Sequence, residues 1–181
     1  MKKVLIVNVC KEKLHYLEFV KPIEDILKNN KIKFKTLIYK NINKSQLIKY
    51  NKIIISGTSL KDNYFLKDIG KFSWIKDTEI PILGICSGMQ IIGLEFGGRL
   101  KKKTEIGFFK ENFKKDLLGL KREQEVYHLH NNYIEFTEHF EIISKNNITQ
   151  AVKHKSKEIY GVLFHPEVRN KKLILNFIDK K

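Results

Sequence analysis

The stretch Ile80-Pro81-Ile82-Leu83-Gly84-Ile85-Cys86-Ser87-Gly88 decides the fold of this chain. An apolar run, short enough for one buried strand, leads directly into a cysteine flanked by two glycines, and a helical pattern follows over residues 89–96. The glycines permit a tight strand-to-helix turn that presents Cys86 above the edge of a sheet. Helix N-terminal N–H groups favour a nearby thiolate and can stabilise an oxyanion. We predict a nucleophile elbow; a cysteine buried as a small apolar side chain is the alternative.

Short apolar runs alternate with helical patterns on both sides of the elbow. Wholly apolar strands separated by helices are typical of a parallel sheet covered on both faces, whereas the second half has fewer helical patterns and predicts an antiparallel edge. We expect strands over residues 4–9, 34–39, 53–55, 80–85, 105–109, 125–129, 140–143 and 159–164, and helices over residues 17–27, 45–50, 89–96 and 170–180. The predicted fold class is therefore α/β, with a mostly parallel open sheet. Without a repeat or a linker, residues 1–181 form one expected domain.

The 181 residues include 35 Lys and Arg against 20 Asp and Glu, a net charge of +15. Only Arg99, Arg122 and Arg169 are arginine, and the lysines are spread along the whole chain. Nucleic-acid recognition favours the planar fork of arginine, so we predict no nucleic-acid partner. No apolar run reaches membrane-spanning length, no cleavage site follows the basic N-terminus, and two cysteines build no disulfide framework. We expect a cytoplasmic protein that has no membrane partner.

A histidine near the end of the chain is the candidate base for Cys86. His165 follows the apolar run 159–164, so it should lie at the carboxyl edge of the sheet, where Cys86 also emerges. Glu167 follows two residues later, with Pro166 fixing the chain between them, and could orient the imidazole. The alternative is a His-Pro turn that merely ends a strand. The elbow and this segment support each other as nucleophile, base and orienting acid.

These segments resemble the class I, triad-type glutamine amidotransferase family. The elbow is Gly84-x-Cys86-x-Gly88-x-Gln90, the C-terminal motif is Gly161-Val-x-Phe164-His165-Pro166-Glu167, and Glu105-x-Gly107 follows a Gly-Gly pair. The motifs stand in the family's order along nearly the whole chain. Within the family, the chain most resembles the separate glutaminase subunit of archaeal-type GMP synthase.

The resemblance implies that Cys86 attacks the side-chain amide of glutamine to form a thioester. His165 would protonate the departing ammonia and then activate water, and Glu167 would orient His165. The implied oxyanion donors are the N–H groups of Ser87 and of the loop at Gly57 and Thr58. Gln90, His130 and Asn131 match positions that contact glutamine in the family. The ammonia would pass to a separate ATP-dependent synthetase, most simply GMP synthase aminating XMP, or to a paralogous enzyme. No cofactor is expected in this chain, and ATP and Mg²⁺ are expected on the partner.

Two segments depart from the family pattern. Ser56-Gly57-Thr58-Ser59 stands where GMP synthases read Ser-Gly-Gly-Pro, and Leu129-His130-Asn131-Asn132 stands where they read Ser-His-x-Asp. A β-branched Thr58 resists the positive φ that glycine allows, so it could restrict the loop that supplies an oxyanion donor. Two other functions therefore stay open: a stand-alone γ-glutamyl amide hydrolase and a catalytically weak regulatory module.

The remaining histidines give no further site prediction. His128-x-His130 could be two metal ligands on one face of a strand, but no carboxylate or cysteine stands at ligand spacing beside them, so we expect no metal site. His15, His139 and His154 have no partner pattern and are expected on the surface.

Overall fold

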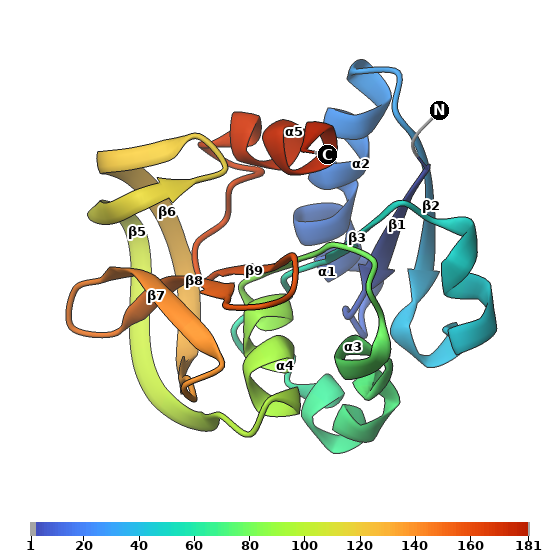
Figure 1. The fold of residues 1–181 in the computed structure, drawn as a ribbon, viewed down its shortest axis with the longest axis horizontal. Helices are drawn as coiled ribbons and strands as arrows, with labels where there is room; N and C mark the ends of the chain where they lie inside the picture. Colours follow the sequence, from blue (N-terminus) through green and yellow to red (C-terminus); the bar gives the residue numbers. More distant parts are fainter. Residues whose placement is uncertain (1–2, 181) are drawn as a thin grey trace.

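The computed structural model describes residues 3–180, which build one nine-stranded sheet with helices on both faces (Figure 1). The strand order is β2-β1-β3-β4-β9-β8-β7-β5-β6. The strands are β1 (Lys3–Asn8), β2 (Lys33–Ile38), β3 (Lys52–Ile55), β4 (Ile82–Ile85), β5 (Arg99–Leu117), β6 (Leu120–Glu135), β7 (Phe140–Lys145), β8 (Thr149–His154) and β9 (Ile159–Val162). The predicted α/β class is confirmed.

Short helices connect these strands. They are α1 (Lys13–His15), the π-helical turn η1 (Tyr16–Val20), α2 (Lys21–Asn29), the 3₁₀ segments η2 (Tyr39–Asn41), η3 (Lys44–Lys49) and η4 (Tyr64–Phe72), α3 (Trp74–Asp77), α4 (Ser87–Glu95) and α5 (Lys171–Asp179). Pro22 lies in the first turn of α2, where its missing N–H needs no partner. Among residues 3–180, no helix combines the length and the apolarity that crossing a membrane demands.

The first five strands in the spatial order, β2 to β9, are parallel to one another. β3, β4 and β9 are buried along their whole lengths, because helices cover both faces of the sheet. One face packs against α2 and α5, where Ile23 and Phe177 are fully buried. The other face packs against α4, η4 and α3, where Ile92 and Phe65 are fully buried.

The remaining strands are antiparallel and differ in length from the prediction. The expected strands 105–109 and 125–129 are the centres of β5 and β6, a hairpin of 19 and 16 residues that curves away from the helices (Figure 1). Much of β5 is exposed, so lysines such as Lys101–Lys103 fit on it and no apolar alternation marks its ends. β8 has no counterpart in the prediction, because Thr149, Gln150 and Lys153 break its apolar pattern.

The parallel part of the sheet determines where the chemistry can lie. β4 and β9 are neighbours, with Ile85 opposite Val162 at their carboxyl ends. The backbone N–H of Cys86 donates to the carbonyl of Val162 at 2.8 Å. The chain that leaves β4 and the chain that leaves β9 therefore start from adjacent points at one edge of the sheet.

Candidate active site

The turn between β4 and α4 has the geometry of a nucleophile elbow. Cys86 has φ 49° and ψ −105°, a strained conformation for a residue with a side chain. A Cβ at Gly84 would lie 2.5 Å from Cδ1 of Ile92, and a Cβ at Gly88 would lie 2.3 Å from the carbonyl oxygen of Ile55. The two glycines are thus required by close packing, and the packed turn holds Cys86 at the N-terminus of α4.

His165 lies beside Cys86. A Cβ placed on Gly57 would lie 2.8 Å from Cε1 of His165 and 3.3 Å from Cβ of Cys86, so the two side chains adjoin the same glycine. Glu167 holds the His165 ring, because Nδ1 of His165 lies 2.7 Å from Oε1 of Glu167. The backbone N–H of His165 donates to the Tyr127 carbonyl at 2.8 Å. The structure therefore brings the three predicted catalytic residues together.

The charges around His165 favour its protonated form. Burial by itself would lower the pKa of His165, but its electrostatic interactions and hydrogen bonds with Glu167 and Cys86 outweigh burial. The net effect raises the pKa of His165 well above its ordinary value of 6.5. A buried imidazolium held by a carboxylate can donate a proton to a leaving group.

The predicted oxyanion donors lie on two segments near Cys86. Ser87 begins α4, and Gly57 and Thr58 follow β3. The Gly57 carbonyl accepts a hydrogen bond from Sγ of Cys10 at 3.5 Å. Burial raises the pKa of Cys10 to about 12, although hydrogen bonds with Thr58 and Ser56 oppose the rise. Cys10 is therefore a neutral donor that holds the loop, and its thiol is not a second nucleophile.

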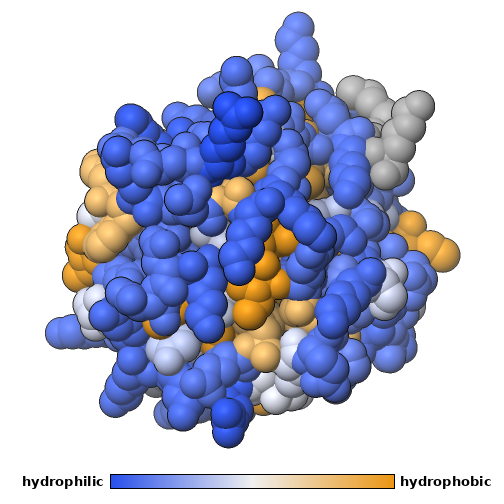
Figure 2. Space-filling view, turned by 60° about the vertical axis from the view of Figure 1, so that its left-hand side comes forward, coloured by the Kyte–Doolittle hydropathy of each residue, from blue (hydrophilic) through white to orange (hydrophobic). Residues whose placement is uncertain are grey.

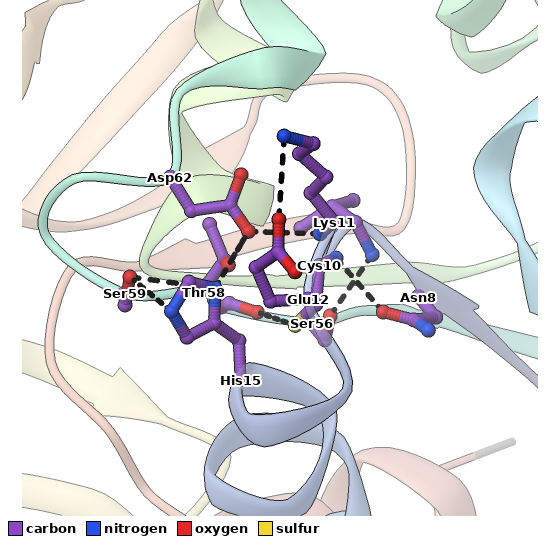
Figure 3. Close-up of polar contacts among 11 residues, drawn as sticks. Asn8, Cys10, Lys11, Glu12, His15, Ser56, Thr58, Ser59 and Asp62 are labelled. Carbon is purple, nitrogen blue, oxygen red and sulfur yellow. Dashed lines mark hydrogen bonds and ion pairs between the residues drawn. The ribbon is translucent and has the colours of Figure 1, made fainter.

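Asp62 fastens the loop that carries Thr58, as Figure 3 shows. Its Oδ2 accepts hydrogen bonds from Oγ1 of Thr58 at 2.8 Å and from the N–H of Lys11 at 2.8 Å. The same atom lies 2.9 Å from Nδ1 of His15, whose Nε2 is 3.0 Å from Oγ of Ser59. Burial would raise the pKa of Asp62, but these hydrogen bonds lower it. We call residues 56–62, held in this way, the latched loop.

The latched loop joins residues that sequence reasoning did not connect. The sequence predicted no role for Asp62. The prediction that His15 lies on the surface is wrong, since its imidazole pairs with Asp62 and only 20% of its side chain is exposed. His154 is also buried, where it accepts hydrogen bonds from the backbone N–H groups of Ser156 and Lys157. No local pattern marks a contact between residues 47 positions apart in the chain.

The predicted glutamine contacts surround Cys86 but leave little space. Nε2 of Gln90 donates to the Asn132 carbonyl at 3.1 Å, and Nδ2 of Asn131 donates to the Leu60 carbonyl at 2.7 Å. The cavity that these residues line with Cys86 and Thr58 has a volume of about 10 Å³. A space of this size holds about one water molecule. A side chain the size of glutamine would fit beside Cys86 only if residues that line this cavity moved.

His130 lines the same cavity, and its imidazole pairs with a carboxylate on the neighbouring strand. Nε2 of His130 is 3.2 Å from Oε2 of Glu105, and Nδ1 of His128 is 3.1 Å from the same oxygen. The prediction that no carboxylate lies beside His128 and His130 is wrong, because Glu105 lies beside both in the folded chain. Glu105 is opposite His130 in the β5–β6 hairpin, a cross-strand contact that residue spacing along the chain does not reveal.

A second cavity lies on the other side of the triad. It has a volume of about 160 Å³ and is lined by Glu18, Phe19, Tyr127, Leu129, His165, Glu167 and Val168. His165 and Glu167 thus face a larger space than Cys86 does. Small molecules such as water and ammonia fit within this volume.

Known proteins resemble this chain in sequence and in fold. The sequence profile described as "Glutamine amidotransferase class-I" matches residues 15–180. The GMP synthase (glutamine-hydrolysing) of Thermosipho africanus is 38% identical over 143 residues, which are 71% of this chain and 27% of that protein. The enzyme of Francisella philomiragia is 37% identical over 138 residues, 69% of this chain and 26% of that protein. The chain spans about a quarter of the length of these relatives.

Solved structures share the fold. A protein of Thermoplasma acidophilum described as a subunit of GMP synthase superposes with a TM-score of 0.87 at 27% identity, covering 98% of this chain and 92% of that one. A glutamine amidotransferase of Thermotoga maritima superposes with a TM-score of 0.74 at 21% identity, covering 94% and 78%. By sequence profile, sequence identity and fold, this chain belongs to the class I glutamine amidotransferase family and is related to the glutaminase domain of GMP synthase.

Proposed function

We propose that the chain hydrolyses the side-chain amide of glutamine and supplies the ammonia to a partner synthetase. The observation that carries the proposal is the convergence of Cys86, His165 and Glu167 at the carboxyl edge of the sheet in a member of this family. A strained nucleophile at a helix N-terminus, a protonated histidine and a buried carboxylate are the groups that acyl transfer from an amide requires.

The reaction balances with these groups alone. The Cys86 thiolate adds to the amide carbon of glutamine, and the charge that develops on oxygen is stabilised by backbone N–H groups of Ser87 and Thr58. The carbon–nitrogen bond breaks as protonated His165 gives its proton to nitrogen, releasing ammonia and leaving a γ-glutamyl thioester. His165 then takes a proton from water, whose hydroxide releases glutamate and regenerates the thiolate. Glu167 holds the ring in position throughout.

The partner that receives the ammonia is proposed to be a synthetase of the GMP synthase type, which aminates XMP, or a paralogous enzyme. The curated relatives are glutamine-hydrolysing GMP synthases about four times as long as the matched region, and the Thermoplasma protein is described as a subunit. ATP and Mg²⁺ would bind on that partner, because the hydrolysis above needs no cofactor. The nearly closed cavity beside Cys86 supports partner dependence, since docking could release the latched loop.

Glutamate release from glutamine tests the proposal. We expect slow release by the chain alone, faster release once its synthetase is added, and none from Cys86→Ala under either condition. Cys10→Ala is the matched control, because its thiol is a neutral donor and should leave activity nearly intact. Full activity in Cys86→Ala would contradict the mechanism. Affinity purification from the native cell would identify the synthetase.

One observation favours a second candidate function, a non-catalytic regulatory module. The cavity of about 10 Å³ excludes glutamine, and Thr58 is fastened where relatives of the GMP synthase type carry glycine. A glutamine-analogue electrophile separates the two functions. Labelling of Cys86 in the presence of the synthetase supports the glutaminase, whereas no labelling even with the synthetase supports the module. Rapid partner-free turnover of other γ-glutamyl amides would instead indicate a stand-alone hydrolase.

A further inference from the structure

A cluster of ionisable side chains lies on the β5–β6 hairpin, apart from the catalytic triad. Glu105 is directly opposite His130, and Gly107 is opposite His128, so the three ionisable side chains share one face of the hairpin. Gly107 contributes no side chain to that face, which leaves His128 free to turn toward Glu105. The two histidines are buried and Glu105 is nearly so.

Three atoms of this cluster form a nearly equilateral triangle. Nδ1 of His128 is 3.1 Å from Oε2 of Glu105, Nε2 of His130 is 3.2 Å from that oxygen, and the two nitrogens are 3.2 Å apart. Ligand atoms bound about 2.0–2.1 Å from one metal ion at angles of about 90–110° are separated by about 2.9–3.4 Å. The three atoms are therefore already spaced as one triangular face of a metal's coordination shell.

We propose that Glu105, His128 and His130 bind a divalent transition-metal ion, with Zn²⁺ as the best match. Two imidazole nitrogens and one carboxylate oxygen are a ligand set that suits zinc, and water could complete four-coordination. The proposal does not depend on glutamine hydrolysis, because no step of that reaction passes through the ion.

The groups around the cluster support this assignment. Nε2 of His128, the nitrogen that would not bind the ion, lies 3.5 Å from Oε1 of Glu111, as in sites where an outer carboxylate orients a histidine ligand. Oγ of Ser144 donates to the other oxygen of Glu111 at 3.2 Å. Nε2 of Gln150 donates to Oε2 of Glu105 at 2.7 Å and holds that carboxylate in place. The ligands are thus themselves held by neighbouring side chains.

Each histidine of the cluster keeps its second ring nitrogen on the side away from the proposed ion. Among the described residues, Nε2 of His128 and Nδ1 of His130 are buried and have no hydrogen-bond partner. These two nitrogens would stay unbound by the ion, so the geometry of the other three atoms carries the proposal. A bound ion would fix both rings with their remaining N–H groups pointing outward, in the case of His128 toward Glu111. The competing interpretation is a proton shared among these side chains with no metal.

The ion would anchor the part of β6 that contacts the triad. The Leu129 carbonyl, between the two histidines, accepts a hydrogen bond from Sγ of Cys86 at 3.6 Å. The Tyr127 carbonyl accepts one from the backbone N–H of His165 at 2.8 Å. Zinc would therefore stabilise the hairpin where it supports both catalytic residues.

Metal titration of Cys86→Ala tests the proposal, because this variant removes the thiolate beside His165 that could itself bind zinc. Tag-free protein would be stripped with a chelator and titrated with Zn²⁺ against a chromophoric indicator. We expect one ion per chain and a rise of about 5–10 °C in Tm at saturating zinc. Co²⁺ should give the visible bands of nitrogen and oxygen ligation without a sulfur-to-cobalt charge-transfer band.

Three further substitutions locate the ion. His128→Gln should weaken zinc binding by about 100-fold or more, and Glu111→Gln by about 10- to 100-fold. His139→Gln, which changes an exposed histidine outside the cluster, should leave binding unchanged. Failure of the stripped protein to bind zinc stoichiometrically, binding that survives His128→Gln, or a sulfur-to-cobalt band would overturn the site and favour the shared proton. If His128→Gln does not fold, the cobalt spectrum and Glu111→Gln still decide.

Discussion

Gly57 is in contact with both the nucleophile and the base of the candidate site. An added methyl group would lie 2.8 Å from Cε1 of His165 and 3.3 Å from Cβ of Cys86, closer than ordinary packing allows. Both neighbours are held from behind, His165 by Glu167 and Cys86 by its elbow. Neither side chain can move to make room without changing the distance between the Cys86 sulfur and the His165 imidazole.

We therefore expect Gly57→Ala to reduce glutamate release by about 100-fold, the scale of effect that a displacement of about 1 Å produces in an active site. Steady-state assays with the synthetase present measure the loss. Gly70→Ala is the matched control, because a Cβ at Gly70 meets nothing within 4 Å. Equal activities of the two variants would show that Gly57 does not govern the distance.

Glu167 is expected to control the protonation of His165. Burial opposes the imidazolium, so removing the carboxylate in Glu167→Gln should lower the pKa of His165. Because the pKa of His165 is raised in the folded state, its stabilising effect is complete below about pH 6.5 and is lost as pH rises through the folded-state pKa. The difference in unfolding free energy between the native protein and Glu167→Gln should thus be largest at acidic pH and shrink with rising pH.

Urea unfolding at a series of pH values measures this difference. Glu138→Gln, an exposed substitution away from the site, should show a difference that does not vary in this way. A pH-independent difference for Glu167→Gln would mean that the carboxylate only packs against the ring.

At the scale of elements, the latched loop lines the small cavity beside Cys86. Asp62 joins the loop to the segment after β1 through Thr58, Lys11 and His15. Asp62→Asn removes the charge that these hydrogen bonds share, and hydrogen bonds to a charged group contribute about 1.5–3 kcal/mol each. We expect small alkylating agents to modify Cys86 about tenfold faster or more in this variant.

Mass spectrometry of the modified peptide follows the rate for Asp62→Asn. Asp77→Asn is the control, since Asp77 pairs with Lys44 on the exposed surface and does not contact the loop. An unchanged rate in Asp62→Asn would show that another contact closes the cavity.

Glu158 links the C-terminal end of α5 to the centre of the sheet. It accepts hydrogen bonds from Tyr160 on β9 and from Lys180 after α5, and it pairs with Lys153 on β8 at 3.1 Å. Burial would raise the pKa of Glu158, but these partners lower it to about 2. The stability from this group is therefore present above about pH 4.3 and is lost as pH falls toward 2.

Glu158→Gln should accordingly lower the free energy of unfolding near neutral pH, and the difference from the native protein should vanish in acid. Chemical unfolding followed by circular dichroism at falling pH measures it. Glu79→Gln, which changes a mostly exposed carboxylate paired with Lys157, should cost less. A difference that persists at pH 2 would rule out an electrostatic contribution from Glu158.

At the scale of the whole molecule, the hairpin presents an apolar strip beside the triad. Phe108 is 58% exposed and Val168 is 48% exposed, and Arg169 lies over the Phe108 ring at 5.8 Å. Figure 2 turns this side of the molecule forward and shows apolar side chains gathered among hydrophilic ones. Val168 also lines the cavity of about 160 Å³ next to His165, so we expect a partner to dock over Phe108 and Val168.

We expect Phe108→Ser to weaken association with the synthetase, whereas Ile48→Ser, an exposed apolar substitution in η3, should not. Because the net charge is +15, association with an acidic partner should also weaken as salt rises. Calorimetric titration at several salt concentrations measures both effects. Binding that does not change with salt concentration would mean that the lysines reflect only the composition of the chain and not an interface. Equal binding by Phe108→Ser and Ile48→Ser would mean that the interface lies elsewhere.

The parts of the fold that sequence reasoning predicted correctly are those whose signals are local. In three segments, the residues that determine the local structure lie within a few positions of one another. They are the run ending in Ile85, the glycines around Cys86, and the segment His165 to Glu167. The length of β5 was not predictable in this way, because its exposed lysines satisfy no apolar pattern, and polar residues concealed β8. Cross-strand pairing defines both strands, and pairing is a property of the folded sheet.

The sequence by itself determined the α/β class, the elbow, the family resemblance and the candidate catalytic residues, because short-range sterics and buried strands leave few alternatives. Only the tertiary structure decided that Asp62 fastens the loop over Cys86 and that Glu105 meets His128 and His130. These contacts join residues 4 to 51 positions apart through strand register and loop packing. Register and packing are set by the whole sheet at once, so no single stretch of the chain encodes them.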